Sequence, residues 1–122
     1  MNNLIIDAAK DKIFFMIIAD NKSYTSEFSN NRENFDKLTI LIIKFLKNHD
    51  LNIKNLSNIF VNQGPGKFSS IRTSISVAKA LSAVNGANLY GFSSNNLKNM
   101  NYMNIIDLYK KELLTKKRNV QS

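Results

Sequence analysis

The residues best placed for specific chemistry form a short glycine-rich segment, GPGKFSSIR, at positions 64–72. Two glycines around a proline predict a sharp change of chain direction. If a helix follows, its free N–H groups can bind an anion. The segment therefore has two interpretations, a purely structural turn or an anion site. The candidate residues are Gly64, Pro65, Gly66, Phe68, Ser69 and Arg72.

The segment does not match the common nucleotide-binding loops. A phosphate-binding P-loop needs a glycine where Val61 stands and a Ser or Thr directly after its lysine, whereas Phe68 follows Lys67. A dinucleotide-binding loop needs a third glycine where Ser69 stands. Neither of these two nucleotide-binding mechanisms is predicted.

Asp7 and His49 are the remaining candidates for chemistry. Asp7 lies at the end of a predicted strand, where it is either a metal ligand or a hydrogen-bond acceptor in a turn. No second carboxylate is placed near it by the sequence. His49, the single histidine, lies near the end of a predicted helix, where a cation is favourable in itself. We predict no catalytic residue, no metal site and no peptidase activity.

Composition restricts the classes of protein that this chain can be. Its 122 residues suffice for one domain, and the absence of cysteine excludes disulfides and thiolate chemistry. The longest apolar run, residues 13–19, is far shorter than the ~20 residues of a membrane-crossing helix. The amino terminus lacks the pattern of a signal peptide. We expect a cytoplasmic protein without a membrane segment.

The net charge of +8 is concentrated near the carboxyl end. Residues 98–122 hold six Lys or Arg against two Asp or Glu, a net +4. The tail containing Lys116, Lys117 and Arg118 is either a solvated terminus or a contact for a phosphate backbone. No aromatic residues interleave with these cations, as base stacking would require.

Hydrophobic periodicity predicts an α/β fold. Strands are expected at 3–8, 13–19, 24–28, 56–61 and 88–92, and helices at 31–48, 68–84 and 102–117. Asn31 is the expected cap of the first helix and Gly86 the residue that ends the second. This order predicts a mixed five-stranded sheet, a β-meander followed by two right-handed crossovers, flanked by helices.

Two of the predicted helices have more apolar or small surface than one sheet can cover. Residues 38–46 are apolar nearly all round, with Ile40 and Ile43 widening the stripe. The second helix carries a track of small residues that lets another helix lie close. We expect residues from both helices to divide between the core and a partner surface. These candidates are Leu38, Leu41, Ile42, Phe45, Ile71, Ile75 and Ala78.

The segment VNQGPGKFSSIRTSISVAKALS, residues 61–82, resembles the signature of the TsaB family of tRNA threonylcarbamoyladenosine biosynthesis proteins. The opening LIIDAA also resembles the first strand of that family. Lys67 and Ser70 depart from the small residues usual in the turn, and Ala8 and Ala9 replace residues that related ATPases use beside phosphate. The matching positions are Gly64, Pro65, Gly66, Phe68, Arg72, Val77, Ala78, Lys79 and Leu81.

The resemblance implies the first half of an actin-like fold, of the sugar kinase, Hsp70 and RNase H-like type. Residues 1–97 would form this amino-terminal lobe, and residues 98–122 a carboxyl-terminal helix with a basic tail. The second lobe of a typical member is expected to be absent.

The resemblance further implies a non-catalytic scaffold or activator of a TsaD-like threonylcarbamoyl transferase, with a TsaE-like ATPase in the complex. ATP and Mg²⁺ would be used by that complex, and this chain would bind no cofactor. Contact with tRNA would be at most indirect, and the isolated chain would be a homodimer. The alternatives are an RNA-binding module that uses the basic tail, or a degenerate actin-like nucleotide-binding phosphotransferase.

Overall fold

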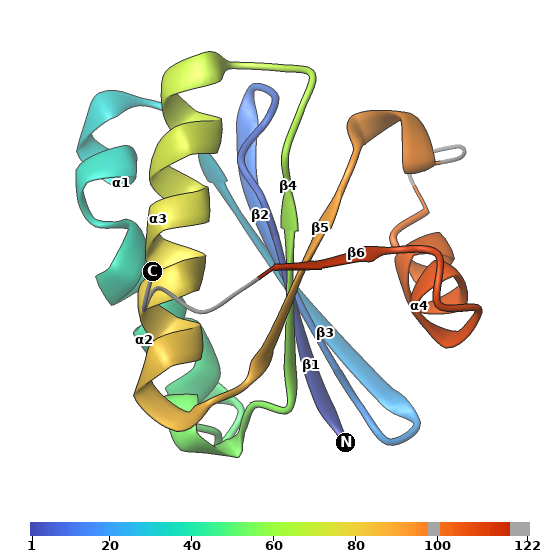
Figure 1. The fold of residues 1–122 in the computed structure, drawn as a ribbon. Coiled ribbons are helices and arrows are strands. Elements are labelled where there is room, and N and C mark those ends of the chain that lie inside the picture. Colours follow the sequence, from blue (N-terminus) through green and yellow to red (C-terminus); the bar gives the residue numbers. More distant parts are fainter. Residues whose placement is uncertain (98–100, 118–122) are drawn as a thin grey trace.

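A computed structural model describes residues 1–97 and 101–117, which form one mixed sheet with helices on both faces (Figure 1). The spatial order of the strands is β3-β2-β1-β4-β5-β6. The strands are β1 (Asn2–Asp7), β2 (Lys12–Ala19), β3 (Lys22–Ser29), β4 (Asn58–Asn62), β5 (Asn88–Phe92) and β6 (Thr115–Lys117). The helices are α1 (Arg32–Asp36), α2 (Leu38–Asn48), α3 (Phe68–Asn85) and α4 (Met103–Lys110), with short 3₁₀ turns η1 (Ile53–Asn55) and η2 (Ser94–Asn96).

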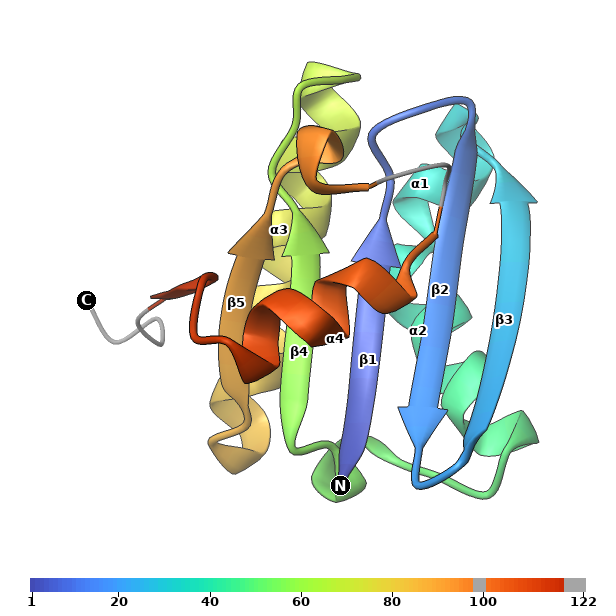
Figure 2. The same cartoon turned by 90° about the vertical axis from the view of Figure 1, so that its right-hand side faces the viewer.

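The strand pairing confirms the predicted meander and the mixed sheet. The first three strands pair antiparallel, β1, β4 and β5 pair parallel, and β6 returns antiparallel along β5. Helices α1, α2 and α3 cover one face of the sheet, and α4 crosses the other (Figures 1 and 2). The carboxyl ends of the three parallel strands therefore lie at the same edge of the sheet.

The predicted helix over 102–117 is correct only in its first half. Helix α4 ends at Lys110, and Glu112 takes a left-handed backbone conformation with φ of 58°. The chain then reverses, and β6 adds a sixth strand where five were predicted. The turn is closed by the Leu113 N–H, which donates to the Leu108 carbonyl over 2.9 Å.

The predicted first helix is divided into α1 and α2 at Lys37. Asn31 is the N-cap, as predicted, and its side-chain oxygen accepts from the Asn34 N–H over 2.9 Å. The second predicted helix ends at Gly86 with φ of 74°, a conformation that favours glycine. Within the described parts of the chain, no helix is long and apolar enough to cross a membrane.

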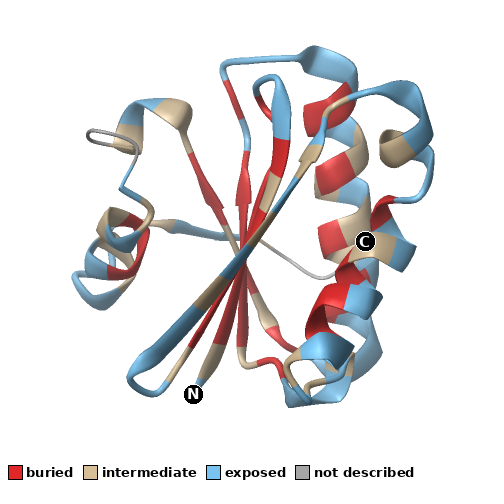
Figure 3. Ribbon diagram, turned by 180° about the vertical axis from the view of Figure 1, so that it is seen from behind, coloured by how far each residue is buried: buried red, intermediate tan, exposed pale blue. Residues whose placement is uncertain are grey.

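Two hydrophobic cores lie on opposite faces of the sheet. Figure 3 shows buried residues along the central strands and on helices at both faces. Alternate residues of each central strand point to opposite faces, so β1 contributes Leu4 and Ile6 to one core and Ile5 to the other. The larger core lies between the sheet and α2 and α3. The smaller one lies under α4, where Ile105 and Ile106 are buried.

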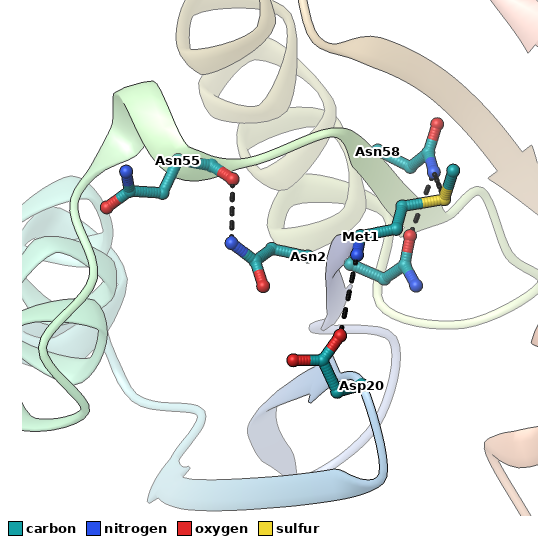
Figure 4. Close-up of polar contacts among 6 residues, drawn as sticks. Met1, Asn2, Asp20, Asn55 and Asn58 are labelled. Carbon is teal, nitrogen blue, oxygen red and sulfur yellow. Dashed lines mark hydrogen bonds and ion pairs between the residues drawn. The ribbon is translucent and has the colours of Figure 1, made fainter.

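Polar residues fix the amino end of β1 to its neighbours. Asn2 donates to the Asn55 carbonyl over 2.9 Å, and the terminal amine of Met1 lies 3.8 Å from an Asp20 carboxylate oxygen (Figure 4). Buried Asn58 on β4 donates to Asn3 over 2.8 Å. Because buried amides need such partners, this contact favours the observed register of β1 and β4.

Candidate functional site

The glycine-rich turn lies at the edge of the sheet where the parallel strands β1, β4 and β5 end. This is the position at which open α/β sheets most often bind ligands. The Gly64–Pro65 peptide bond is cis. A Cβ at Gly66 would lie 2.2 Å from the carbonyl oxygen of Ala9, and the Lys67 N–H donates to that oxygen over 2.8 Å. Glycine is therefore required at position 66 for the two turns to touch.

Asn30, at the end of β3, connects the turn after β1 to the start of α3. Its amide nitrogen donates to the carbonyls of Ala8, over 3.0 Å, and Lys10, over 2.7 Å. The Ser70 hydroxyl on α3 donates to its amide oxygen over 3.1 Å. Ser70, a departure from the family pattern, is thus a structural contact here.

Asn62 and Ser94 hold the other side of the glycine-rich turn. The side-chain oxygen of Asn62 accepts from the Gly64 N–H over 2.7 Å, and its amide nitrogen donates to Ser94 Oγ over 3.0 Å. Ser94 Oγ donates to the Pro65 carbonyl over 2.8 Å. Much of the polar capacity of the turn is therefore used within the chain.

The residues after the turn are more exposed. Phe68 is 70% exposed, and the Arg72 guanidinium lies 5.3 Å from the centre of its ring. Ser69 is also exposed, and the first turn of α3 has no side-chain cap. The structure thus shows a structural turn, and an anion site at the start of α3 stays a prediction.

Asp7 is buried, and both of its carboxylate oxygens accept hydrogen bonds. Oδ1 accepts from the Ala9 N–H over 3.0 Å, and Oδ2 accepts from the Tyr102 hydroxyl over 2.6 Å. Burial, followed by the contact with Asp7, raises the pKa of Tyr102 above its usual value. Asp7 is thus a turn acceptor, as one of the two interpretations predicted.

The Tyr102 ring also stacks on Phe14 of β2, with ring centres 4.1 Å apart. A cavity of about 580 Å³ lies beside this pair and reaches Thr25 and Glu27 on β3. Within residues 1–97 and 101–117, no three His, Asp or Glu side chains are grouped to hold a metal ion. Sequence reasoning missed Tyr102, because no local pattern marks its contact with Asp7.

His49 has aromatic neighbours. Its ring stacks on Tyr24 of β3 with centres 4.0 Å apart and meets the edge of Phe45, 5.3 Å away. It also forms the C-cap of α2. These contacts support the structural interpretation of this residue.

The structure separates the predicted interface residues into two groups. The first group is buried within the chain itself and so offers no surface to a partner. Its members are Leu38, Ile42, Phe45, Ile71 and Ala78. Leu41 and Ile75 are half-buried at the margin of the core.

The apolar side chains that the core leaves exposed are different ones. Ile40 is 52% exposed, Ile43 42% and Val84 59%. Ile43 and Val84 line an open groove of about 590 Å³ between the end of α2, η1 and the end of α3. We call Ile40, Ile43 and Val84 the apolar helix surface. Both helices therefore carry exposed apolar side chains, but none of these three is among the residues predicted for the partner surface.

Comparison with known proteins identifies relatives of the chain. Residues 29–105 match the family model "TsaD: tRNA N6-adenosine threonylcarbamoyltransferase". The chain is 30% identical over 91 residues to the tRNA threonylcarbamoyladenosine biosynthesis protein TsaB of Buchnera aphidicola subsp. Schizaphis graminum. That alignment covers 75% of this chain and 43% of the relative.

Solved structures show the same fold. YeaZ from Pseudomonas aeruginosa superposes with a TM-score of 0.73 at 14% identity, over 91% of this chain and 49% of its own. RuvC of T. thermophilus, solved in complex with a Holliday junction substrate, gives a TM-score of 0.56 at 10% identity, over 80% of this chain and 68% of its own. The fold is thus RNase H-like, and the chain spans about half of YeaZ and less than half of the TsaB relative.

Proposed function

Because the chain belongs to the TsaB family and matches the TsaD family model, we propose that it acts in tRNA threonylcarbamoyladenosine biosynthesis as a non-catalytic partner of a TsaD-type transferase. It would pair with that transferase, in a complex that includes a TsaE-type ATPase. The complex would use ATP and Mg²⁺ and would contact tRNA mainly through its other subunits. Its compartment would be the cytoplasm.

The apolar helix surface is the observation that carries this proposal. Contiguous exposed apolar side chains often mark a surface that another molecule covers. Ile40 and Ile43 lie on α2, and Val84 lies on α3 across the groove. Exposed Ser76, Ala80 and Ala83 on α3 are small enough to let a partner helix approach closely. An interface of standard size buries about 800 Å² on each partner.

The environment of Asp7 supports a role without catalysis. A carboxylate that holds Mg²⁺ or activates water must present at least one oxygen to the ligand. Both oxygens of Asp7 already accept from groups of this chain, Ala9 and Tyr102, and burial of the residue limits access to the remaining lone pairs. We expect the chain to act by stabilising the active conformation of the transferase.

Co-elution with the TsaD-type protein tests the proposal. We expect wild-type chain to co-elute in size-exclusion chromatography and Ile43→Asp to elute alone. Leu113→Asp is the matched control, because Leu113 is 65% exposed but lies outside the apolar helix surface. A reconstituted modification assay with TsaD-type and TsaE-type proteins should need the chain. Full modification without it, or co-elution of a folded Ile43→Asp, would contradict the proposal.

A further inference from the structure

A pocket of about 470 Å³ lies on the α4 side of the sheet. Its walls come from β5, from the end of α4, and from the segment that leads into β6. It combines two aromatic rings with two cations and one carboxylate. The lining residues are Tyr90, Tyr109, Lys110, Glu112, Leu114 and Lys116.

Strand pairing places a cation beside an aromatic ring in this pocket. Phe60, Tyr90 and Lys116 are successive partners across β4, β5 and β6, so their side chains stand in one row on one face. The Phe60 and Tyr90 rings are nearly parallel, with centres 5.5 Å apart. Tyr90 therefore has Phe60 on one side and Lys116 on the other.

Tyr109 of α4 completes the aromatic wall. Its ring meets Tyr90 edge-on at 5.2 Å and Phe60 at 5.4 Å. The Asn58 amide lies 3.4 Å from its hydroxyl. These contacts fix the orientation of both tyrosines, which remain half exposed. The pocket thus has a rigid aromatic wall.

The charges around the pocket are mixed. Lys110 and Lys116 are exposed at its rim, as is Glu112. Partial burial, then Tyr109, then the charge of Glu112 raise the pKa of Tyr90, and both Tyr90 and Glu112 line the pocket. A phosphodiester can therefore meet the cations while a base meets the rings and the carboxylate.

We propose that this pocket binds single-stranded RNA. Aromatic rings beside cations bind unpaired nucleotides, because each base has a face that stacks and each phosphate a charge that pairs. Glu112 can accept a hydrogen bond from the exocyclic amine of adenine or cytosine, which uracil lacks. The basic tail alone did not predict this site, because both tyrosines come from other elements. The proposal does not depend on pairing with a transferase.

Fluorescence anisotropy with a labelled single-stranded oligoadenylate, added to the full chain, tests the proposal. We expect Tyr90→Ala to weaken binding roughly five-fold or more, and Tyr90→Phe to retain it. Lys116→Ala should weaken binding and reduce the slope of log K against log salt by about 0.7. Lys117→Ala is the matched control. Lys117 is the next residue on β6 and faces the opposite side, where burial and then Lys79 lower its pKa.

Base preference and strandedness complete the test. We expect oligoadenylate to bind more tightly than oligouridylate, and Glu112→Gln to reduce that difference. Duplex RNA should compete weakly, because its bases are not free to stack. Absence of binding at low salt, or equal losses for Lys116→Ala and Lys117→Ala, would overturn the proposal. The comparison of Lys116→Ala with Lys117→Ala tests the proposal even if Tyr90→Ala does not fold.

Discussion

The Tyr102 hydroxyl donates to the Asp7 carboxylate over 2.6 Å, although the two residues are 95 positions apart. The contact joins the start of α4 to the end of β1. It places the stacked rings of Tyr102 and Phe14 beside the edge of the sheet where the parallel strands end. The first strand of this chain thus ends in a carboxylate that serves as a structural anchor.

Removing this hydroxyl should destabilise the protein. A hydrogen bond to a charged group contributes about 1.5–3 kcal/mol, and Tyr102 is only partly buried. We therefore expect Tyr102→Phe to lower the free energy of unfolding by about 1–2 kcal/mol in urea denaturation. Tyr24→Phe, which alters a ring stacked on His49, should change it by less than ~0.5 kcal/mol. Equal effects would contradict the role given to the contact.

The same contact predicts a dependence on alkaline pH. The folded state raises the pKa of Tyr102 above the ordinary value of 10.0. Above pH 10 the unfolded chain loses this proton while the folded chain keeps it, so stability falls as pH rises. Below that pH the contribution is fully present. We expect urea denaturation to show a steeper loss of stability above pH 10 for wild type than for Tyr102→Phe, whereas parallel curves would argue against the shift.

Local sequence patterns predicted most of the fold, because the residues that begin, form and end its central strands and helices carry recognisable signals. The apolar runs of β1 and β2, the cap at Asn31 and the left-handed Gly86 each carry a signal within a few residues. The helix predicted after Lys110 was wrong, because Glu112 takes a left-handed conformation that its residue type does not favour. The return along β5 is decided by pairing with a strand more than twenty positions away.

The candidate sites were less predictable than the fold. The glycine-rich segment was found from its composition. Asn30 binds Ser70 of that segment from 40 positions away, and Ser94 binds Pro65 from 29 positions away. For α2, periodicity gives an apolar helix without saying which side the sheet covers. Ile42 and Ile43 are adjacent and chemically identical, yet one is fully buried and the other 42% exposed. Only tertiary packing separates them.

Gly66→Ala should weaken the contact between the two turns. An added Cβ would lie 2.2 Å from the Ala9 carbonyl oxygen, so the backbone must move and the hydrogen bond from Lys67 must lengthen or break. We expect a loss of about 1–3 kcal/mol, measured by urea denaturation. Ser69→Ala, at an exposed position nearby, should change stability by less than ~0.5 kcal/mol. A stable Gly66→Ala would show that the turns can separate freely.

Ile42 and Ile43 offer a paired test of the core and the apolar helix surface. A carboxylate at position 42 would be fully buried without a partner, so Ile42→Asp should fail to fold or lose more than ~3 kcal/mol. Ile43→Asp should fold with a loss of less than ~1 kcal/mol, because water reaches that position. Circular dichroism with thermal melting measures both. Comparable losses would place Ile43 in the core and remove it from the partner surface.

Self-association is the expected behaviour of the chain without its partner. Exposed Ile43 and Val84 line one groove, and Ile40 lies three residues before Ile43 on the same helix face. Two copies related by a two-fold axis can cover these residues mutually. Light scattering should therefore give the mass of a dimer at high concentration, with dissociation on dilution. Ile43→Asp should shift the equilibrium at least ten-fold toward monomer, since about 1.4 kcal/mol suffices. Leu113→Asp should leave it unchanged. A wild-type monomer at the highest concentration would mean that these side chains cannot cover one another, and a partner with a different surface would then be required.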